Sequence, residues 1–105
     1  MKPRPASADE LVMLAKAVAD LHGLHGTHRE SVHVREVFGD QVVWEGDVEV
    51  FDVRGNATIS RAYAWSHETD EGRRRYVAVL HTRQVNSPVA AVRASLVADQ
   101  RKLRA

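Results

Sequence analysis

The feature that most constrains the fold is a strict alternation in the middle of the chain. Between Val42 and Val50, apolar or small residues hold the even positions, while the acids Glu45, Asp47 and Glu49 hold odd positions. Successive side chains of a β-strand point to opposite faces of its sheet, so the alternation predicts a strand with one apolar and one acidic face. Because burying a carboxylate costs on the order of several kcal/mol, we expect the even-numbered residues to face the core and the acids to face water.

Three other runs of β-branched and aromatic residues have the character of strands, and short turn sequences separate them. The expected strands are Val32–Phe38, Val42–Val53, Thr58–Ser66 and Arg74–Thr82. Glycine-containing turns follow the first three, at residues 39–41, 55–56 and 70–72. Because turns this short connect antiparallel neighbours, the strands are expected to form a four-stranded antiparallel meander.

The lengths of these turns also predict which residues lie opposite one another. A three-residue first turn places Val32 opposite Val48, and a two-residue second turn places Val48 opposite Tyr63 and Gly46 opposite Trp65. These pairings put the apolar partners on a single face of the sheet. The glycine then leaves room for the indole ring above it.

Both ends of the chain carry helix signals. Ser7 and Glu10 form a capping box, and apolar residues then recur at helical spacing until a glycine, which predicts a helix over Ala8–His22. The dipeptide Ser87-Pro88 is typical of a second helix start, with serine as the cap and proline in the first turn. Because only one face of the sheet is expected to be apolar, both helices are placed on that face.

We therefore predict a single α+β domain over residues 1–105, with residues 1–6 as a flexible N-terminus. Its expected architecture is a two-layer sandwich, in which an antiparallel four-stranded meander carries the N- and C-terminal helices on one face, in the order α-β-β-β-β-α. A length of 105 residues is the usual size of one domain. The chain has no cysteine, which excludes a disulfide framework and thiol catalysis.

In that arrangement the second face of the sheet is uncovered, although part of it is apolar. The residues concerned are Phe51, Ala62, Ala64, Tyr76, Ala78 and Leu80. An exposed apolar surface of that extent is unusual for a monomer, so we expect self-association into a homodimer through this face or an edge strand. The alternative is the normal scatter of apolar residues over a protein surface. Charged residues interrupt any secretory signal, and no stretch has the length of a membrane span. These features predict a cytoplasmic protein with no membrane partner.

The net charge of +1 hides an uneven distribution along the chain. Residues 1–72 hold 7 basic and 13 acidic residues, whereas residues 73–105 hold 8 basic residues and one acid. The basic residues either neutralise acids within the fold or form a patch that binds the phosphates of a nucleic acid. The candidates for such a patch are Arg73, Arg74, Arg75, Arg93, Arg101, Lys102 and Arg104.

The expected register also places three polar residues of complementary chemistry at one end of the apolar face. Arg61 lies opposite His81, and Asp52 is one position further along the neighbouring strand. A carboxylate, a guanidinium and an imidazole in one place can bind an anionic ligand or orient a histidine for proton transfer. The alternative is an ion pair between Asp52 and Arg61 that serves only the fold.

A run of histidines follows the first helix. His22, His25 and His28 are separated by glycines and single residues, and His33 comes shortly afterwards. Neutral imidazole is a ligand for zinc, nickel and copper, so these residues are a weak metal-binding candidate. Their spacing matches no standard ligand pattern, and the alternative is a polar loop at the end of a helix.

Together these features predict a small cytoplasmic binding or interaction module, homodimeric and without catalysis of its own. The alternative is a nucleic-acid-binding domain that uses the basic C-terminal third of the chain. A third interpretation is a small enzyme or metal-dependent protein that uses His81 or the histidine run. No cofactor is expected.

Overall fold

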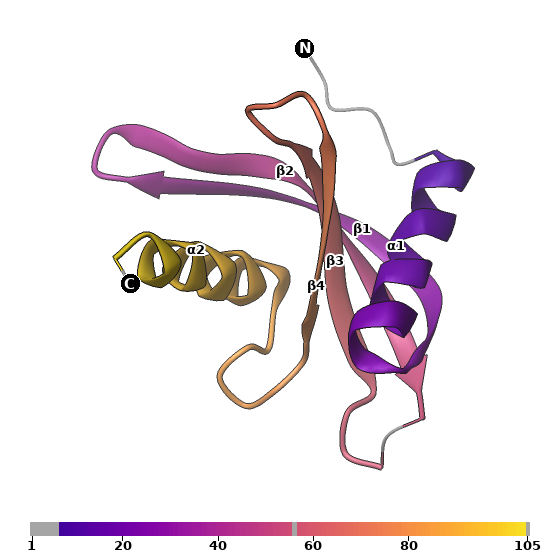
Figure 1. Ribbon diagram of the computed structural model, residues 1–105. Coiled ribbons are helices and arrows are strands. Elements are labelled where there is room, and N and C mark those ends of the chain that lie inside the picture. Colours follow the sequence, from indigo (N-terminus) through magenta and orange to yellow (C-terminus); the bar gives the residue numbers. More distant parts are fainter. Residues whose placement is uncertain (1–6, 56, 105) are drawn as a thin grey trace.

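The order of the elements confirms the predicted meander and its flanking helices. The computed structural model describes residues 7–55 and 57–104, with side chains described as far as residue 99. The elements are α1 (Ala8–His22), β1 (His25–Phe38), β2 (Gln41–Arg54), β3 (Arg61–Glu68), β4 (Arg74–Leu80) and α2 (Pro88–Arg104) (Figure 1). The strands form one antiparallel sheet in the order β1-β2-β3-β4, which makes the chain an α+β fold. The expected flexibility of residues 1–6 lies outside the described residues.

Both helices begin where the sequence predicts. The Ser7 hydroxyl accepts a hydrogen bond of 3.1 Å from the Glu10 amide, and the Ser87 hydroxyl accepts one of 3.1 Å from the Ala90 amide. α1 ends at Gly23, whose φ of 69° favours glycine because a side chain is strained in that region. Within the described residues, neither helix combines the length and the apolar character that crossing a membrane requires.

The register of the sheet agrees with the prediction over most of the first hairpin but not in the second, and at the tip Phe38 lies opposite Gln41 rather than the expected Val42. Val32 lies opposite Val48, as expected. Tyr63 lies opposite Val50 rather than Val48, because residues 55–60 join β2 to β3 where a two-residue turn was expected. The longer connection moves the register by two residues, and an even shift leaves every side chain on its expected face.

The predicted placement of both helices on one face is wrong, because they cover opposite faces of the sheet (Figure 1). α1 packs Leu14 against the face that carries Phe51, and α2 packs Val92 against the face that carries Val50. The even-numbered face of β2 is apolar as predicted, but the odd-numbered face also becomes apolar at Phe51 and Val53. Each face therefore needs a helix, and the molecule has three layers instead of two.

The face beneath α1 is consequently not the uncovered apolar surface that the sequence analysis expected. Phe51, Ala62 and Ala64 are buried there, and three further residues of the expected surface are partly buried against them. These three are Tyr76, Ala78 and Leu80. The expected dimer interface on this face is therefore wrong, since α1 occupies it.

The prediction that all three acids of β2 face water is wrong for Glu49, which is 1% exposed. Its Oε1 atom accepts a hydrogen bond from the Ser31 hydroxyl and lies 3.0 Å from His28 Nε2. Glu45 stays exposed, and Asp47 is half-buried. β1 supplies these partners, with Ser31 directly opposite Glu49 and His28 three residues before Ser31, and both contact Oε1.

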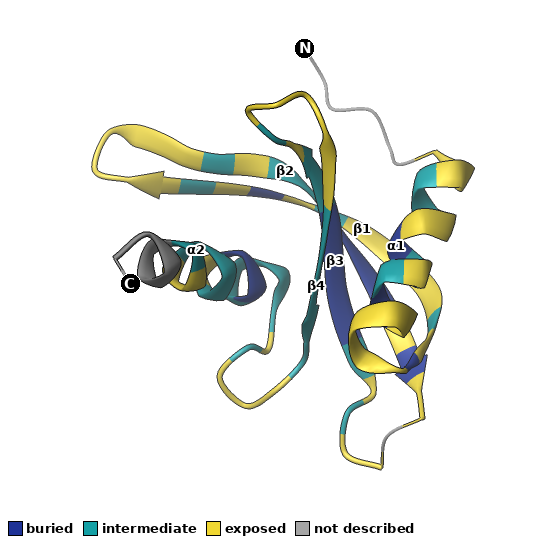
Figure 2. Ribbon diagram, viewed as in Figure 1, coloured by how far each residue is buried: buried dark blue, intermediate teal, exposed yellow. Residues whose placement is uncertain are grey.

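The first hairpin extends well beyond the rest of the sheet. In the described part of the chain, β2 pairs with β3 over Glu49–Asp52, and its earlier residues run beside β1 alone. We call residues 32–48 of this hairpin the arm, and Figure 1 shows it projecting from the sheet next to α2. The far end of the arm is exposed (Figure 2). Its exposed large apolar residues are Val37, Phe38, Val42 and Val43.

Candidate functional site

A cleft of about 310 Å³ opens where β2 and β3 separate. Beyond their short pairing, β2 continues with β1 and β3 continues with β4, and α2 lines the space between them. The lining residues are Trp44, Glu45, Trp65, His67, Val92, Ser95, Leu96 and Asp99. We call this space the tryptophan cleft. Its size is at the lower end for pockets that hold small molecules.

The chain contains two tryptophans, and they meet in this cleft. Their ring centroids are 5.8 Å apart and their planes are inclined by 71°, which is a T-shaped contact. A Cβ atom on Gly46 would lie 3.2 Å from Trp44 Cη2, so the glycine leaves the space that the Trp44 ring occupies. The predicted pairing of Gly46 with Trp65 is wrong, because β2 pairs with β3 over Glu49–Asp52 and Gly46 precedes that stretch, where it makes room for Trp44 instead.

The polar rim of the cleft is mainly acidic. Glu45 Oε2 lies 2.9 Å from His33 Nε2, and Asp99 Oδ1 lies 3.6 Å from the Arg75 guanidinium. His33 also lies 3.0 Å from Asp47 through its Nδ1 atom. The hydrogen bond to Glu45, followed by the one to Asp47, raises the pKa of His33 above its usual value.

The predicted trio of Asp52, Arg61 and His81 is brought together only in part. The His81 amide donates a hydrogen bond of 2.9 Å to the Arg61 carbonyl, so these two residues are neighbours as expected. Asp52 lies opposite Arg61 in the register, but its carboxylate pairs with Arg29 at 3.3 Å. That arrangement supports a structural ion pair for Asp52, although with a different arginine from the one expected.

Sequence reasoning missed Tyr63 as the group that joins this end of the sheet. Its hydroxyl shares a hydrogen bond of 2.7 Å with His81 Nδ1, while its ring is buried. Burial raises the pKa of Tyr63, and the nearby Arg61 guanidinium partly offsets that rise. The signal was present in the sequence, because Arg61 and Tyr63 are two residues apart in one strand and therefore share a face.

The arginines of the expected basic patch do not all lie on one face of the sheet. Arg74 and Arg75 are successive residues of β4, so their side chains leave opposite faces of the sheet. Basic residues of the C-terminal third are paired with acids. The ion pairs are Arg74–Glu10 at 3.4 Å, Arg75–Asp99 at 3.6 Å and Arg93–Glu36 at 2.7 Å. The side chains of Arg101, Lys102 and Arg104 lie outside the described residues.

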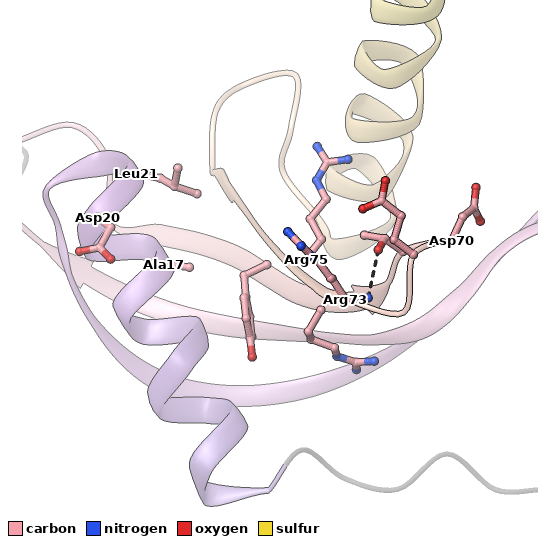
Figure 3. A pocket seen from close by; sticks show the side chains of 10 residues that line it. Ala17, Asp20, Leu21, Asp70, Arg73 and Arg75 are labelled. Carbon is pink, nitrogen blue, oxygen red and sulfur yellow. Dashed lines mark hydrogen bonds between the residues drawn. The ribbon is translucent and has the colours of Figure 1, made fainter.

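Arg73 lines an open pocket of about 710 Å³ between α1 and the β3–β4 turn (Figure 3). Asp20 and Asp70 line the same pocket, and Figure 3 shows Arg75 extending from it toward α2. Arginines and carboxylates therefore line this space together. Such a mixture favours neutralisation within the fold over a surface of one sign for phosphates.

Two of the three histidines expected to form a metal site have side-chain hydrogen bonds within the protein. His22 Nε2 lies 2.9 Å from the Ala78 carbonyl oxygen, and His28 is bonded to Glu49. His25 begins β1, where it lies opposite Arg54. Across the described residues, no group of three histidine or acidic side chains is arranged to hold a metal ion.

The sequence places both tryptophans on the core face of the sheet but does not show where β3 leaves β2, on which the tryptophan cleft depends. Trp65 is indeed buried, but Trp44 is only half-buried, since it precedes the point at which β3 joins β2.

Comparison of the chain with family models, with curated proteins and with solved structures gave no match.

Proposed function

We propose that the protein is a non-catalytic cytoplasmic interaction module that works as a homodimer, with the end of the arm as its interface. The observation that carries the proposal is Phe38, which is 82% exposed at the tip of the arm. Fully burying one such side chain is worth about 1.5–3 kcal/mol. Clustered exposed apolar residues on a projecting hairpin are typical of an interaction surface.

Both faces of the arm are apolar at its end, which indicates how it associates. Val42 and Val43 are successive strand residues, so they point to opposite faces, and they are 44% and 47% exposed. A flat partner covers one of these faces and leaves the other in water. A second copy of the arm is a suitable partner, because an apolar tip is complementary to itself and a twofold axis buries the same residues on both copies.

The pairing of charged groups supports the non-catalytic part of the proposal. Charged residues at three different places on the sheet each have an ion-pair partner within the protein. These residues are Asp52, Glu49 and Arg74. Such groups hold elements together, as in ordinary structural ion pairs. The absence of cysteine suits a reducing compartment, which is why we place the protein in the cytoplasm.

Light scattering of the purified chain tests the proposal. We expect a mass near twice the monomer mass of 11.7 kDa. Phe38→Ser removes the side chain from both copies, which weakens the dimer by about 3 kcal/mol or more, or over a hundredfold in Kd. Val12→Ser is the matched control, because Val12 is 66% exposed but lies on α1. A wild-type monomer at high concentration, or a dimer that survives Phe38→Ser, would contradict the proposal.

A further inference from the structure

We propose that the open pocket between α1 and the outer edge of β4 binds an extended peptide segment, which adds to the sheet as a further strand. This pocket of about 710 Å³ shares no residue with the exposed end of the arm, so the inference does not depend on the proposed dimer. It rests on the direction of the backbone groups of β4, the position of the pocket at that edge and the side chains around it.

The outer edge of β4 carries backbone groups that point away from the sheet. β4 is the last strand in the order β1-β2-β3-β4, so β3 is its neighbour on one side only. The His81 amide donates to the Arg61 carbonyl, and hydrogen-bonded pairs alternate along an antiparallel ladder, so the odd-numbered residues of β4 bond to β3. The N–H and C=O groups of the even-numbered Arg74 and Tyr76 therefore point outward, where another strand can pair with them.

The contact between α1 and Ala78 agrees with this direction and shows where the open part of the edge ends. Ala78 is also even-numbered, and its carbonyl oxygen lies 2.9 Å from Nε2 of His22, the last residue of α1. Within the described part of the chain, the outward groups of Arg74 and Tyr76 have no such partner. An added strand therefore pairs with β4 between the β3–β4 turn and Ala78.

The pocket lies directly beside this stretch of the edge. Arg74, Arg75 and Tyr76 are successive strand residues, so their side chains alternate between the two faces of the sheet, yet all three line the pocket. A space that side chains of both faces reach lies at the edge of the strand. Figure 3 shows α1 on one side of this space and Arg75 extending toward α2.

The position of α1 favours a single extended chain as the occupant. Ala17 and Leu21 line the side of the pocket opposite β4, and Leu21 is 60% exposed. A folded partner would have to bring its whole sheet edge past this helix, whereas one added strand needs only the spacing of about 4.8 Å between neighbouring strands. Side chains of the peptide that point toward α1 are expected to be apolar, because they meet Leu21.

The charges of the lining favour basic side chains at the alternate positions. Three lining acids have no ion-pair partner among the described residues, whereas two of the three lining arginines do. The acids are Asp20, Asp70 and Glu71, and the paired arginines are Arg74 and Arg75. The remaining arginine, Arg73, offsets only part of that negative charge. A lysine that points toward the β3–β4 turn therefore meets complementary charge.

Fluorescence anisotropy of a labelled peptide of about seven alternating lysines and valines tests the backbone pairing. In an antiparallel pair the residue opposite Tyr76 shares its face and directs its N–H group toward β4, so these positions are the valines. Methylation of the valine nitrogens should weaken binding about tenfold, as loss of two backbone hydrogen bonds implies, whereas methylation of the lysine nitrogens should retain most of the affinity. Equal affinities of the unmodified and valine-methylated peptides would overturn the inference, as would no binding at about 1 mM protein.

A proline at the edge tests the same contact from the protein. Arg74→Pro removes one outward N–H donor and leaves the bonds between β4 and β3, because proline is tolerated at a free edge. Arg74→Ala is the matched control, since it loses the same side chain and keeps the donor. We expect Arg74→Pro to bind the peptide several-fold more weakly than Arg74→Ala, with the same circular dichroism. Equal binding would overturn the inference.

Further variants test the charges and the identity of the occupant. Asp70→Asn should weaken binding several-fold, and Glu30→Gln, an exposed carboxylate of β1 outside the lining, should not. Equal loss in both would overturn the inference, since general surface charge would explain the binding. A lower mass of Arg74→Pro in light scattering would also overturn it, because a second copy would then cover the edge. Phe38→Ser should leave peptide affinity unchanged, so this inference and the proposed dimer fail separately.

Discussion

The ring of His33 lies between two carboxylates on the arm. All three residues are on the face of the sheet that α1 covers further along. The Nε2 atom of His33 is 2.9 Å from Glu45 and its Nδ1 atom is 3.0 Å from Asp47, and both contacts favour the protonated ring. The pKa of His33 is therefore raised, first by Glu45 and then by Asp47. The proposed dimer interface lies on the arm, so the charge of His33 affects the hairpin that carries this interface.

The raised pKa predicts how stability changes with pH. A group whose pKa is higher in the folded state stabilises the fold fully below its unfolded pKa of about 6.5, and that stability is lost as the pH rises through the folded pKa. We expect urea denaturation to show this loss in the wild type and not in His33→Gln. His25→Gln, at the start of the same strand, should retain it. An identical pH dependence in wild type and His33→Gln would contradict the account.

Gly46 is the residue on which the shape of the tryptophan cleft depends. In Gly46→Ala the new Cβ would lie 3.2 Å from the Trp44 ring, so the ring must move and the emission should change. Crowding of this kind costs about 1–3 kcal/mol of folding free energy. Gly26→Ala is a matched control, because its Cβ would lie 3.3 Å from Phe51 instead. It should lower stability without changing tryptophan emission, and the reverse pattern would refute the assignment.

At the scale of elements, both helices are set by their caps and by the sheet face that each one covers. Ser87 is the cap of α2, and Ala91 and Val92 lie fully buried within the next turn. Fraying at this cap would therefore loosen the helix that lines the tryptophan cleft. The ion pair between Arg93 and Glu36 adds a second link between α2 and the arm.

Removing the cap of α2 should lower the free energy of unfolding by about 1 kcal/mol, because the Ala90 amide loses its acceptor. The change is Ser87→Ala, and the measurement is urea denaturation followed by circular dichroism. Ser87→Asp keeps an acceptor and places a negative charge at the helix start, so it should retain the stability of the wild type. Equal loss in both variants would show that the cap does not act as described.

The sequence predicted the helices and strands, their order, and which residues of β2 share a face, because these follow from local spacing. It did not allow the side of each helix to be predicted, since Phe51 and Val53 make the acidic face apolar near its end. The polar trio failed at Asp52 because Arg29, on a strand with an irregular register, takes its carboxylate. The cleft was beyond sequence reasoning, because it depends on where β3 leaves β2.

Over the whole molecule, acids of the first 72 residues neutralise arginines of the last third. Glu10 pairs with Arg74 and Glu36 pairs with Arg93, across 64 and 57 residues of chain. Opposite charges that are brought together in this way stabilise the closed fold more than they attract an external polyanion. Among the side chains that the structure describes, these pairs offset part of the uneven distribution along the chain.

Such neutralisation predicts weak binding to nucleic acids. In a fluorescence anisotropy titration at physiological salt, labelled RNA and DNA duplexes should bind no more tightly than about 1 μM, the tight end of non-specific binding. Arg73→Ala should change that affinity little, since carboxylates share its pocket. Tight binding that falls steeply with salt and is lost in Arg73→Ala would instead favour the nucleic-acid alternative.

The proposed function depends on the apolar end of the arm as a dimer interface, and hydrogen exchange tests this proposal most directly. Amides of residues 37–43 should exchange more slowly as the protein concentration rises, because dimerisation covers them. Amides of α1 should keep the same rates over that range and provide the internal reference. Exchange in the arm that is fast and independent of concentration would contradict the account.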